Sequence, residues 1–193
     1  MTIQRPEAPA CADPGFHAYV GAPGYGKTFR ALLDFRAYVA ASRVGGIVVD
    51  SASVEGLRSI PQAVDLRDAI ERVFARGEVI RVVPRDVDEF DSLMRVARNP
   101  GGIALFVDEL SFWSRSKELE RLCRTWRHAR CSIYVTLQHI GADLAQTLLS
   151  CNPRMRVFRV SAPRSIEFLM RWHGMSPDEI RDFGVGFFDE RQF

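Results

Sequence analysis

Eight residues near the start of the chain, GAPGYGKT at positions 21–28, constrain the fold more than any other feature. They fit the pattern G-x-x-x-x-G-K-[ST] and follow residues 16–20, a short apolar segment typical of a β-strand. Glycines let a loop wrap closely enough for its N–H groups to point at phosphate oxygens, and a following helix adds positive charge at its N-terminus. The sequence therefore predicts a strand, a phosphate-binding loop (P-loop) and a helix, in that order.

Lys27 and Thr28 are the residues of this loop that carry chemistry. Lys27 is expected to hold the β- and γ-phosphates of ATP, and the Thr28 hydroxyl to bind Mg²⁺. Only two of the 26 basic residues are lysines, and a guanidinium would not fit this role. A glycine-rich turn that merely caps a helix is the alternative. ATP and Mg²⁺ are the predicted cofactors, and the predicted nucleotide-binding residues are Gly21, Ala22, Pro23, Gly24, Tyr25, Gly26, Lys27, Thr28 and Phe29.

A second motif is the apolar strand 103–107, which is followed by Asp108 and Glu109. Asp108 is expected to hold the water shell of Mg²⁺, as the Walker-B aspartate does in P-loop proteins. Glu109 is placed to polarise an attacking water molecule as a general base. An acid pair after a strand can also simply cap a helix. Beside a P-loop, the pair favours ATP hydrolysis by a motor-type enzyme.

Gln138 is the third candidate, because it ends the predicted strand 132–137. In a parallel α/β sheet, ligands gather at the carboxyl ends of the strands. We therefore expect Gln138 near Asp108 and the γ-phosphate, where an amide can orient water and sense phosphate loss. The alternative is an ordinary polar residue at a strand end.

The segment 115–130 carries six basic residues and two acids. Within it, Arg127 and Arg130 are candidates for an arginine finger that acts on the ATP of a neighbouring subunit. Phosphate contacts to DNA are a second interpretation. A solvated helix face is the third, because a spacing of three residues gives no single tight stripe.

Strand and helix patterns alternate along the whole chain with short links, which predicts an α/β fold with helices on both faces of a mainly parallel sheet. At 193 residues, with 47% hydrophobic residues, the chain can pack one core. We expect an N-terminal arm at 1–14 and one P-loop domain at 15–193. No run of about 18 apolar residues is present, so no membrane span is expected. The predicted strands are 16–20, 46–50, 79–83, 103–107, 132–137 and 155–160, and the predicted helices are 27–41, 61–76, 86–98, 116–129, 141–150 and two more that begin near Pro163 and Ser176.

Taken together, these motifs resemble the FtsK–HerA group of P-loop ATPases. The resemblance rests on residues 21–28, on Val107-Asp108-Glu109, and on the segment TWRHAR at 125–130 that leads into Thr136-Leu137-Gln138. It covers roughly residues 15 to 170. It implies a three-layer, RecA/ASCE-like P-loop fold and ATP hydrolysis coupled to movement of DNA.

Within that group, a core of this size is most similar to the genome-packaging ATPases of internal-membrane double-stranded DNA viruses. That resemblance implies double-stranded DNA as a partner, a ring of identical subunits (a hexamer), and contact with proteins of the capsid vertex or portal. It also implies a place in the host cytoplasm or at the packaging vertex of the virion. A Zot-like filamentous phage assembly ATPase and a plasmid mobilisation ATPase are the alternatives within the group.

Two interpretations from other classes stay open. A P-loop nucleotide kinase would transfer phosphate to a small molecule, but no arginine-rich lid insert separates the third and fourth predicted strands. A non-enzymatic subunit of a viral vertex would leave Lys27 and Glu109 without a role. ATPase activity measured with and without double-stranded DNA distinguishes these classes.

Overall fold

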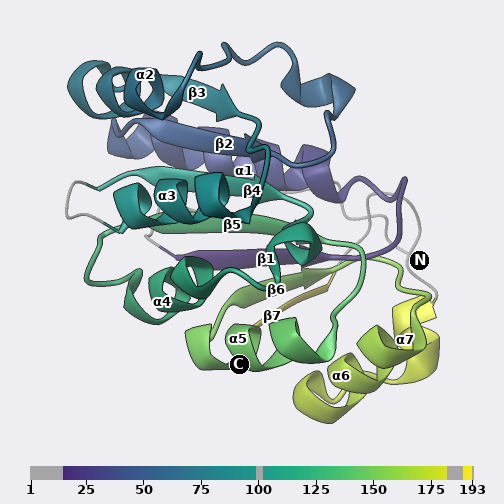
Figure 1. Ribbon diagram of the computed structural model, residues 1–193. Helices are drawn as coiled ribbons and strands as arrows, with labels where there is room; N and C mark the ends of the chain where they lie inside the picture. Colours follow the sequence, from purple (N-terminus) through teal and green to yellow (C-terminus); the bar gives the residue numbers. More distant parts are fainter. Residues whose placement is uncertain (1–14, 99–101, 182–188, 193) are drawn as a thin grey trace.

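The computed structural model describes residues 15–98, 102–181 and 189–192, which form a seven-stranded sheet with helices on both faces (Figure 1). The strand order is β3-β2-β4-β5-β1-β6-β7. All neighbours are parallel except the last pair, in which β7 runs antiparallel to β6. The predicted α/β class with a mainly parallel sheet is confirmed. The strands are β1 Phe16–Val20, β2 Gly46–Asp50, β3 Val79–Val82, β4 Ala104–Asp108, β5 Ser132–Leu137, β6 Arg154–Val157 and β7 Asp189–Gln192.

The helices form the two outer layers. Helix α1 covers one face of the sheet, while α3, α4 and α5 lie in front of the other face in Figure 1. The two faces have separate hydrophobic clusters, of which the one beneath α1 is the smaller. The helices are α1 Lys27–Ser42, α2 Leu66–Ile70, α3 Val87–Ala97, α4 Lys117–Thr125, α5 Ala142–Cys151, α6 Pro163–His173 and α7 Pro177–Arg181, with short helical turns η1 Glu55–Leu57, η2 Glu71–Ala75 and η3 Leu110–Trp113.

Alternation of side chains along each strand decides which residues reach which face. In β4, Leu105 and Val107 belong to the cluster beneath α3 and α4, whereas Phe106 belongs to the cluster beneath α1. Asp108 therefore points to the α1 face. In β5 the same alternation sends Tyr134 and Thr136 toward α1. Thr136 and Asp108 thus belong to the same side of the sheet.

The helix expected over 61–76 is shorter than predicted. Residues around Gln62 continue as extended chain, because Gln62 forms a bridge with Arg81 at the outer edge of β3. The Arg81 N–H donates to the carbonyl of Pro61, at 2.9 Å, and this pairing excludes a helix there. The helix begins only at Leu66, where the side chain of Asp65 accepts a hydrogen bond from the Asp68 N–H. The apolar periodicity could not show that the segment first pairs with a strand.

Two other boundaries depend on local hydrogen bonds. Helix α4 ends at Thr125, not at residue 129, and a turn with Arg130 in the left-handed region (φ 52°) leads into β5. The helix expected near Ser176 begins with a capping box, in which the Ser176 N–H donates to the Glu179 carboxylate (2.7 Å) and the Glu179 N–H donates to the Ser176 hydroxyl (3.2 Å). The predicted arm at 1–14 lies outside the described residues.

Because the strands are parallel, their carboxyl ends lie on one side of the sheet and their amino ends on the other. Their carboxyl ends, on the right in Figure 1, carry the P-loop, and their amino ends, on the left, carry the turn between α4 and β5. No helix in the described part of the chain is long and apolar enough to cross a membrane.

Candidate active site

The predicted P-loop connects β1 to α1 at the carboxyl end of the sheet. Gly24 (φ 82°) and Gly26 (φ 86°) lie in the left-handed region, where a residue with a Cβ atom would be strained. The loop is hydrogen-bonded on both sides: the Gly21 N–H donates to the Leu137 carbonyl at the end of β5 (3.0 Å), and the Ala22 N–H donates to the Arg159 carbonyl just after β6 (2.7 Å). The two positive-φ glycines therefore shape a loop whose base is rigid.

Lys27 begins α1, and its ammonium group lies over the loop. Its Nζ donates to the carbonyl of Ala22 at 3.0 Å, and the side chain is buried. Burial lowers the pKa of Lys27 below its usual value, while the nearby carboxylates of Glu109 and Asp108 oppose that shift. The structure thus places one cation inside the loop, where the sequence predicts a phosphate-binding lysine.

Asp108 connects β4 with β5 and with the first turn of α1. One of its oxygens, Oδ1, accepts a hydrogen bond from the Thr28 hydroxyl and another from the Thr136 hydroxyl, each at 2.9 Å. Thr28 follows β1, Asp108 ends β4, and Thr136 lies in β5 between them. The two predicted Mg²⁺-binding residues, Thr28 and Asp108, are therefore in contact although they are 80 positions apart.

The protonation of Asp108 reflects a balance between burial and hydrogen bonding. Burial raises the pKa of this carboxyl above its usual value, and the hydroxyls of Thr136 and Thr28 oppose the increase by stabilising the charged form. Glu109 and Asp50 raise the pKa further through their negative charges. A bound cation would stabilise the charged form of the Asp108 carboxyl.

Glu109 is held in an uncommon backbone conformation beside Asp108. Its φ of 52° lies in the left-handed region, and its N–H donates to the Thr136 hydroxyl at 2.8 Å. Oxygen Oε1 of its buried side chain accepts hydrogen bonds from the Ser111 hydroxyl and from the Gln138 N–H, the latter at 3.3 Å. A strained residue with a fixed carboxylate at the end of a strand is a frequent feature of functional sites.

Gln138 reaches this site through its backbone, while its side chain is exposed. The predicted neighbourhood of Gln138 and the Asp108–Glu109 pair is present in the structure. Its role in orienting water stays a prediction, since the amide group makes no hydrogen bond to Asp108 or Glu109 among the described contacts.

Arg127 and Arg130 lie far from this site. Both are exposed and belong to the turn before β5, at the amino-end edge of the sheet. The six residues of β5 separate that turn from the carboxyl-end edge by about 20 Å. The Arg127 guanidinium lies over the Trp126 ring, 5.1 Å from its centroid. The structure therefore does not bring these arginines to the P-loop of their own chain.

The remaining predicted nucleotide-binding residues have different surroundings. Tyr25 is partly buried against the cluster beneath α1, and the Arg159 guanidinium lies 5.8 Å from its ring centroid. Phe29, in the first turn of α1, is 69% exposed. Pro23 and Gly24 form the exposed tip of the loop.

The structure adds two residues to the site, Thr136 and Ser111, for which the sequence motifs predict no role. Thr136 donates to Asp108 and accepts from the Glu109 backbone, and Ser111 donates to the Glu109 carboxylate. Thr136 could have been found from its position, because it precedes Gln138 by two residues and so points to the same face of the sheet. Ser111 had no comparable signal, since its contact depends on the conformation of Glu109.

The oxygen donors at the site suit a Mg²⁺ ion. Thr28 and Asp108 supply a hydroxyl and a carboxylate, and Mg²⁺ binds through few protein oxygens together with phosphates and water. No group of three or more potential metal-ligating side chains occurs among residues 15–98, 102–181 and 189–192. The residues present therefore fit a metal that arrives with a nucleotide, not a metal caged by protein alone.

The fold is similar to solved structures of the genome packaging NTPase B204 from Sulfolobus turreted icosahedral virus 2. The complex of that protein with ATP-gammaS has a TM-score of 0.77 and 13% sequence identity over 92% of each chain. Its complex with AMP has a TM-score of 0.75 and 15% identity over 93% of this chain and 92% of that chain. At such identities the likeness establishes the P-loop NTPase fold.

A second similar structure is the pCW3 conjugation coupling protein TcpA in its monomer form with ATPgS. Its TM-score is 0.59 and its identity 15%, over 93% of this chain and 60% of that chain. These likenesses confirm the predicted P-loop NTPase fold. No protein-family model and no curated protein matches the sequence.

Proposed function

We propose that this protein is a Mg²⁺-dependent ATPase that moves double-stranded DNA into a viral capsid. The observation that carries the ATPase part is the contact between Thr28, at the start of the P-loop helix, and Asp108, next to the buried carboxylate of Glu109. This arrangement joins a phosphate-binding loop, oxygen ligands for Mg²⁺ and a candidate base on one edge of the sheet. The packaging part is supported by the likeness to the genome packaging NTPase B204 over nearly the whole of both chains.

Each site residue has a defined task in this proposal. The loop N–H groups and Lys27 bind the phosphates, and Lys27 exchanges its hydrogen bond with the Ala22 carbonyl for one to the γ-phosphate. Thr28 and Asp108 hold Mg²⁺, which neutralises negative charge on the phosphates when bound. Thr136 keeps Asp108 and the Glu109 backbone in register.

Glu109 accepts the proton of the attacking water. Its two hydrogen bonds from Ser111 and Gln138 both end on Oε1, so Oε2 is the oxygen we assign to the water. The left-handed backbone of Glu109 fixes the direction of the carboxylate before ATP arrives. The exposed Gln138 amide orients the same water from the β5 side.

Lys27→Ala and Glu109→Gln test the assignment, because they separate binding from chemistry. Lys27→Ala should weaken ATP binding and abolish turnover. Glu109→Gln should bind ATP and Mg²⁺ normally but hydrolyse about 10²-fold more slowly or worse, the usual scale of a lost general base. Fluorescent-nucleotide binding and phosphate release, each with and without double-stranded DNA, measure both effects.

The outcomes of this experiment are distinct. Normal hydrolysis by Lys27→Ala would disprove the nucleotide site. Equal loss of ATP binding in both variants would make Glu109 a structural residue. Hydrolysis that is insensitive to double-stranded DNA would contradict the motor, and phosphate transfer to a small molecule would favour a nucleotide kinase.

The ring and its arginine finger complete the proposal. Because Arg127 and Arg130 lie at the edge opposite the P-loop, either could act only on the ATP of another subunit, as a head-to-tail ring allows. Loss of such a finger costs about 10³-fold or more in rate in well-measured P-loop systems. A finger that acts mainly in the transition state contributes little to ATP affinity.

Mixing two inactive variants tests the finger. Lys27→Ala subunits have no working nucleotide site but keep the arginines, and Arg127→Ala/Arg130→Ala subunits have the reverse defect. Mixed rings should regain part of the ATPase activity, because some interfaces combine a working site with an intact finger. Absence of recovery in rings shown to be mixed, or normal activity of the double-arginine variant alone, would contradict the finger.

The likeness to the conjugation coupling protein TcpA supports a second candidate, DNA transfer between cells, on the same ATPase chemistry. Because B204 is matched over almost its full length and TcpA over 60% of its length, packaging is the better supported of the two. The proposed location is the host cytoplasm or the packaging vertex, in contact with capsid vertex or portal proteins.

A further inference from the structure

A cluster of arginines surrounds one buried carboxylate at the junction of α3 and α4. Glu118, in the first turn of α4, has a side chain that is only 7% exposed. Its Oε1 lies 2.6 Å from Arg121 Nη1 and 3.6 Å from Arg95 Nε, and its Oε2 lies 3.2 Å from Arg98 Nη1. We call Arg95, Arg98, Arg121 and Glu118 the Glu118 cluster.

The Glu118 cluster carries an excess of positive charge. Three guanidinium groups share one carboxylate, so the cluster has a formal charge of +2, equal to that of the whole chain. The rest of the molecule is therefore neutral on balance. Lys117, beside the cluster, is exposed as well. The positive excess belongs to the cluster itself, because the first turn of α3 is acidic.

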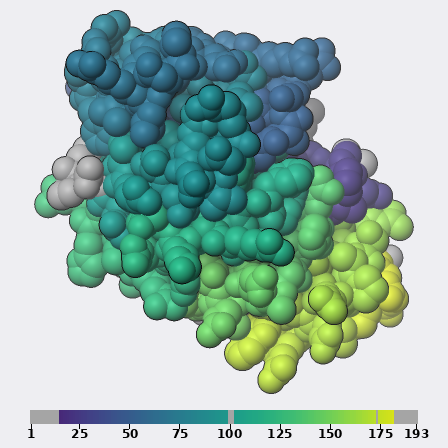
Figure 2. Space-filling view, viewed as in Figure 1, coloured from purple at the N-terminus to yellow at the C-terminus, as the bar shows by residue number. Residues whose placement is uncertain are grey.

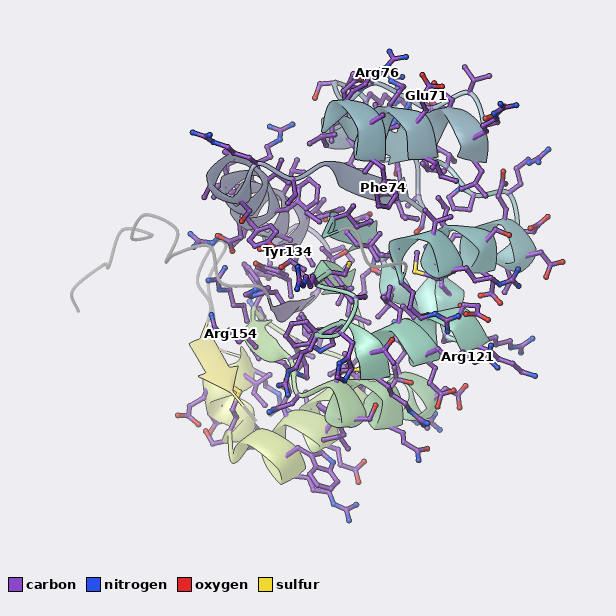
Figure 3. All side chains as sticks on the ribbon, turned by 90° about the vertical axis from the view of Figure 1, so that its left-hand side faces the viewer. Glu71, Phe74, Arg76, Arg121, Tyr134 and Arg154 are labelled. Carbon is purple, nitrogen blue, oxygen red and sulfur yellow. The ribbon has the colours of Figure 1, made fainter. Side chains whose placement is uncertain are left out.

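The arginines of the cluster are both accessible and held in place. Their side chains are 59% exposed for Arg95, 36% for Arg98 and 61% for Arg121, although all three contact Glu118. Figure 2 shows α3 and α4 adjoining on the front face of the molecule, and Figure 3 shows Arg121 at the surface in the rotated view. A guanidinium has five N–H donors, so one contact with Glu118 leaves donors for a second anion. Because the side chains are already ordered, binding that anion loses less conformational entropy.

Resting on the proposed function, we propose that the Glu118 cluster is a surface that binds the phosphate backbone of double-stranded DNA. Planar guanidinium groups match phosphate oxygens in pairs, and they suit sequence-independent contacts better than base readout. The cluster lies outside the nucleotide site, and none of its residues contacts the P-loop, Asp108 or Glu109 in the described structure. DNA and ATP can therefore bind the same subunit together.

The test compares two triple variants that remove the same charge from different places. Arg95→Gln/Arg98→Gln/Arg121→Gln changes the cluster. Arg36→Gln/Arg58→Gln/Arg67→Gln changes three exposed arginines on other parts of the surface. Fluorescence anisotropy with a labelled duplex of about 30 base pairs and mixed sequence, in a series of salt concentrations, gives the affinity and its salt dependence.

We expect the cluster variant to lose about tenfold or more in duplex affinity. Its slope of log K against log salt should decrease by roughly 0.9 for each phosphate that the variant no longer neutralises. The control variant should keep a slope close to that of the wild type. Equal losses of affinity in both variants would mean that only net charge matters and would overturn the proposal, as would an unchanged affinity of the cluster variant.

Removal of three arginines leaves Glu118 buried without a partner, so the variant could unfold. A quadruple variant that adds Glu118→Gln removes the stranded carboxylate and should show the same loss of duplex binding. Circular dichroism and ATP binding, which should both be unchanged, verify the fold. If the quadruple variant is folded and binds the duplex like the wild type, the proposal is wrong.

Two other results separate this inference from the proposed function. If the wild type hydrolyses ATP and binds DNA but the cluster variant loses only self-association in sedimentation, the surface binds a second copy, and the inference alone fails. The acidic first half of α3, with Asp88, Glu89 and Asp91, would then be the surface to examine. If the wild type binds the duplex through the cluster but hydrolyses no ATP, the inference stands and the proposed ATPase fails.

Discussion

Buried carboxylates occur in two kinds of surroundings in this protein. Asp34 in α1 and Glu118 in α4 contact guanidinium groups: Asp34 pairs with Arg30 and Arg156, and Glu118 with three arginines. At the candidate active site, by contrast, Asp108 and Glu109 accept hydrogen bonds from hydroxyls and a backbone N–H. Lys27, the cation of the P-loop, donates its hydrogen bond to a carbonyl instead.

This contrast separates the carboxylates that stabilise the fold from those that remain available to a ligand. A carboxylate paired with arginine has its charge neutralised within the protein and has little left for a ligand. A carboxylate held only by neutral donors is oriented but keeps its charge, which costs stability when it is buried. We infer that Asp108 keeps this unfavourable charge for a metal bound with the nucleotide, and three predictions test the comparison.

The largest expected effect is on stability, from Asp34→Asn. Asp34 accepts a hydrogen bond from the Tyr19 hydroxyl (2.6 Å) as well as pairing with Arg30 and Arg156. Removal of its charge breaks the buried ion pairs with Arg30 and Arg156, and the free energy of unfolding should fall by about 3–5 kcal/mol. Urea denaturation measures the loss.

The matched control for Asp34→Asn is Arg76→Gln. Its ion pair with Glu71 is more than half exposed on both sides, and its loss should change the free energy of unfolding by less than about 1 kcal/mol. Similar effects of the two substitutions would show that the α1 network adds nothing beyond a surface pair.

The second prediction concerns His17, a buried group that lacks a compensating charge. Its ring stacks on Tyr134 with centroids 4.7 Å apart (Figure 3 labels Tyr134), and burial, helped by Arg156 and Arg154, lowers the pKa of His17 from 6.5 to about 3. Between these values the unfolded chain binds a proton that the folded chain does not. Stability is therefore complete above pH 6.5 and decreases as the pH falls below it.

His17→Phe keeps the stacked ring but removes the titration. Between about pH 7.5 and pH 5, the wild type should lose roughly 2 kcal/mol more of its unfolding free energy than the variant. Urea midpoints at several pH values in this range measure the difference. Parallel pH profiles for the two proteins would contradict the assignment of the acid sensitivity to His17.

The smallest expected effect has the opposite sign to that of Asp34→Asn. Asp108→Asn keeps an oxygen that can accept the hydrogen bonds of Thr28 and Thr136 but removes the buried charge. Without nucleotide, the variant should be more stable by about 1 kcal/mol, because active-site strain and charge trade stability for function. With ATP and Mg²⁺ this advantage should be reversed, since the metal loses its carboxylate.

Thermal unfolding of Asp108→Asn with and without ATP and Mg²⁺ checks both signs in one experiment. A decrease in stability without nucleotide would mean that the Asp108 charge is compensated in the folded protein. The contrast between the two kinds of carboxylate would then be incorrect.

Much of the fold could be predicted from local patterns. Five of the strands and the helix after the P-loop agree with the expected ranges to within one residue, because buried parallel strands are continuous apolar runs. The strand expected over 155–160 is β6, which ends at Val157 instead of residue 160. The predicted secondary structure is wrong where pairing with a distant strand overrides the local sequence preference. Residues 61–65 carry a helical pattern but extend along β3, and β7 pairs with β6 across more than 30 positions of intervening chain.

The candidate site shows the same division. Gly21 to Thr28, Asp108 and Glu109 could be recognised because phosphate, Mg²⁺ and water each demand particular groups at a fixed place after a strand. Gln138 could be placed beside them because it follows another strand of the same parallel sheet, at the carboxyl ends of the strands. Ser111 could not be assigned, because its contact with the Glu109 carboxylate depends on the left-handed turn at Glu109. Thr136 could be placed on the correct face of the sheet, but its hydrogen bonds with Asp108 and Glu109 follow only from β5 lying between β1 and β4.

The chemical groups of the candidate site follow from local sequence: a loop whose glycines accept positive φ, one lysine inside it, and two acids after an apolar strand. Which carboxylates form ion pairs with arginine, and which are held only by neutral hydrogen-bond donors, depends on the tertiary structure. The tertiary structure also decided that Arg127 and Arg130 lie across the sheet from their own P-loop. The physical reason is that residue types are local, whereas the desolvation and pairing of a charge depend on which strands and helices pack around it.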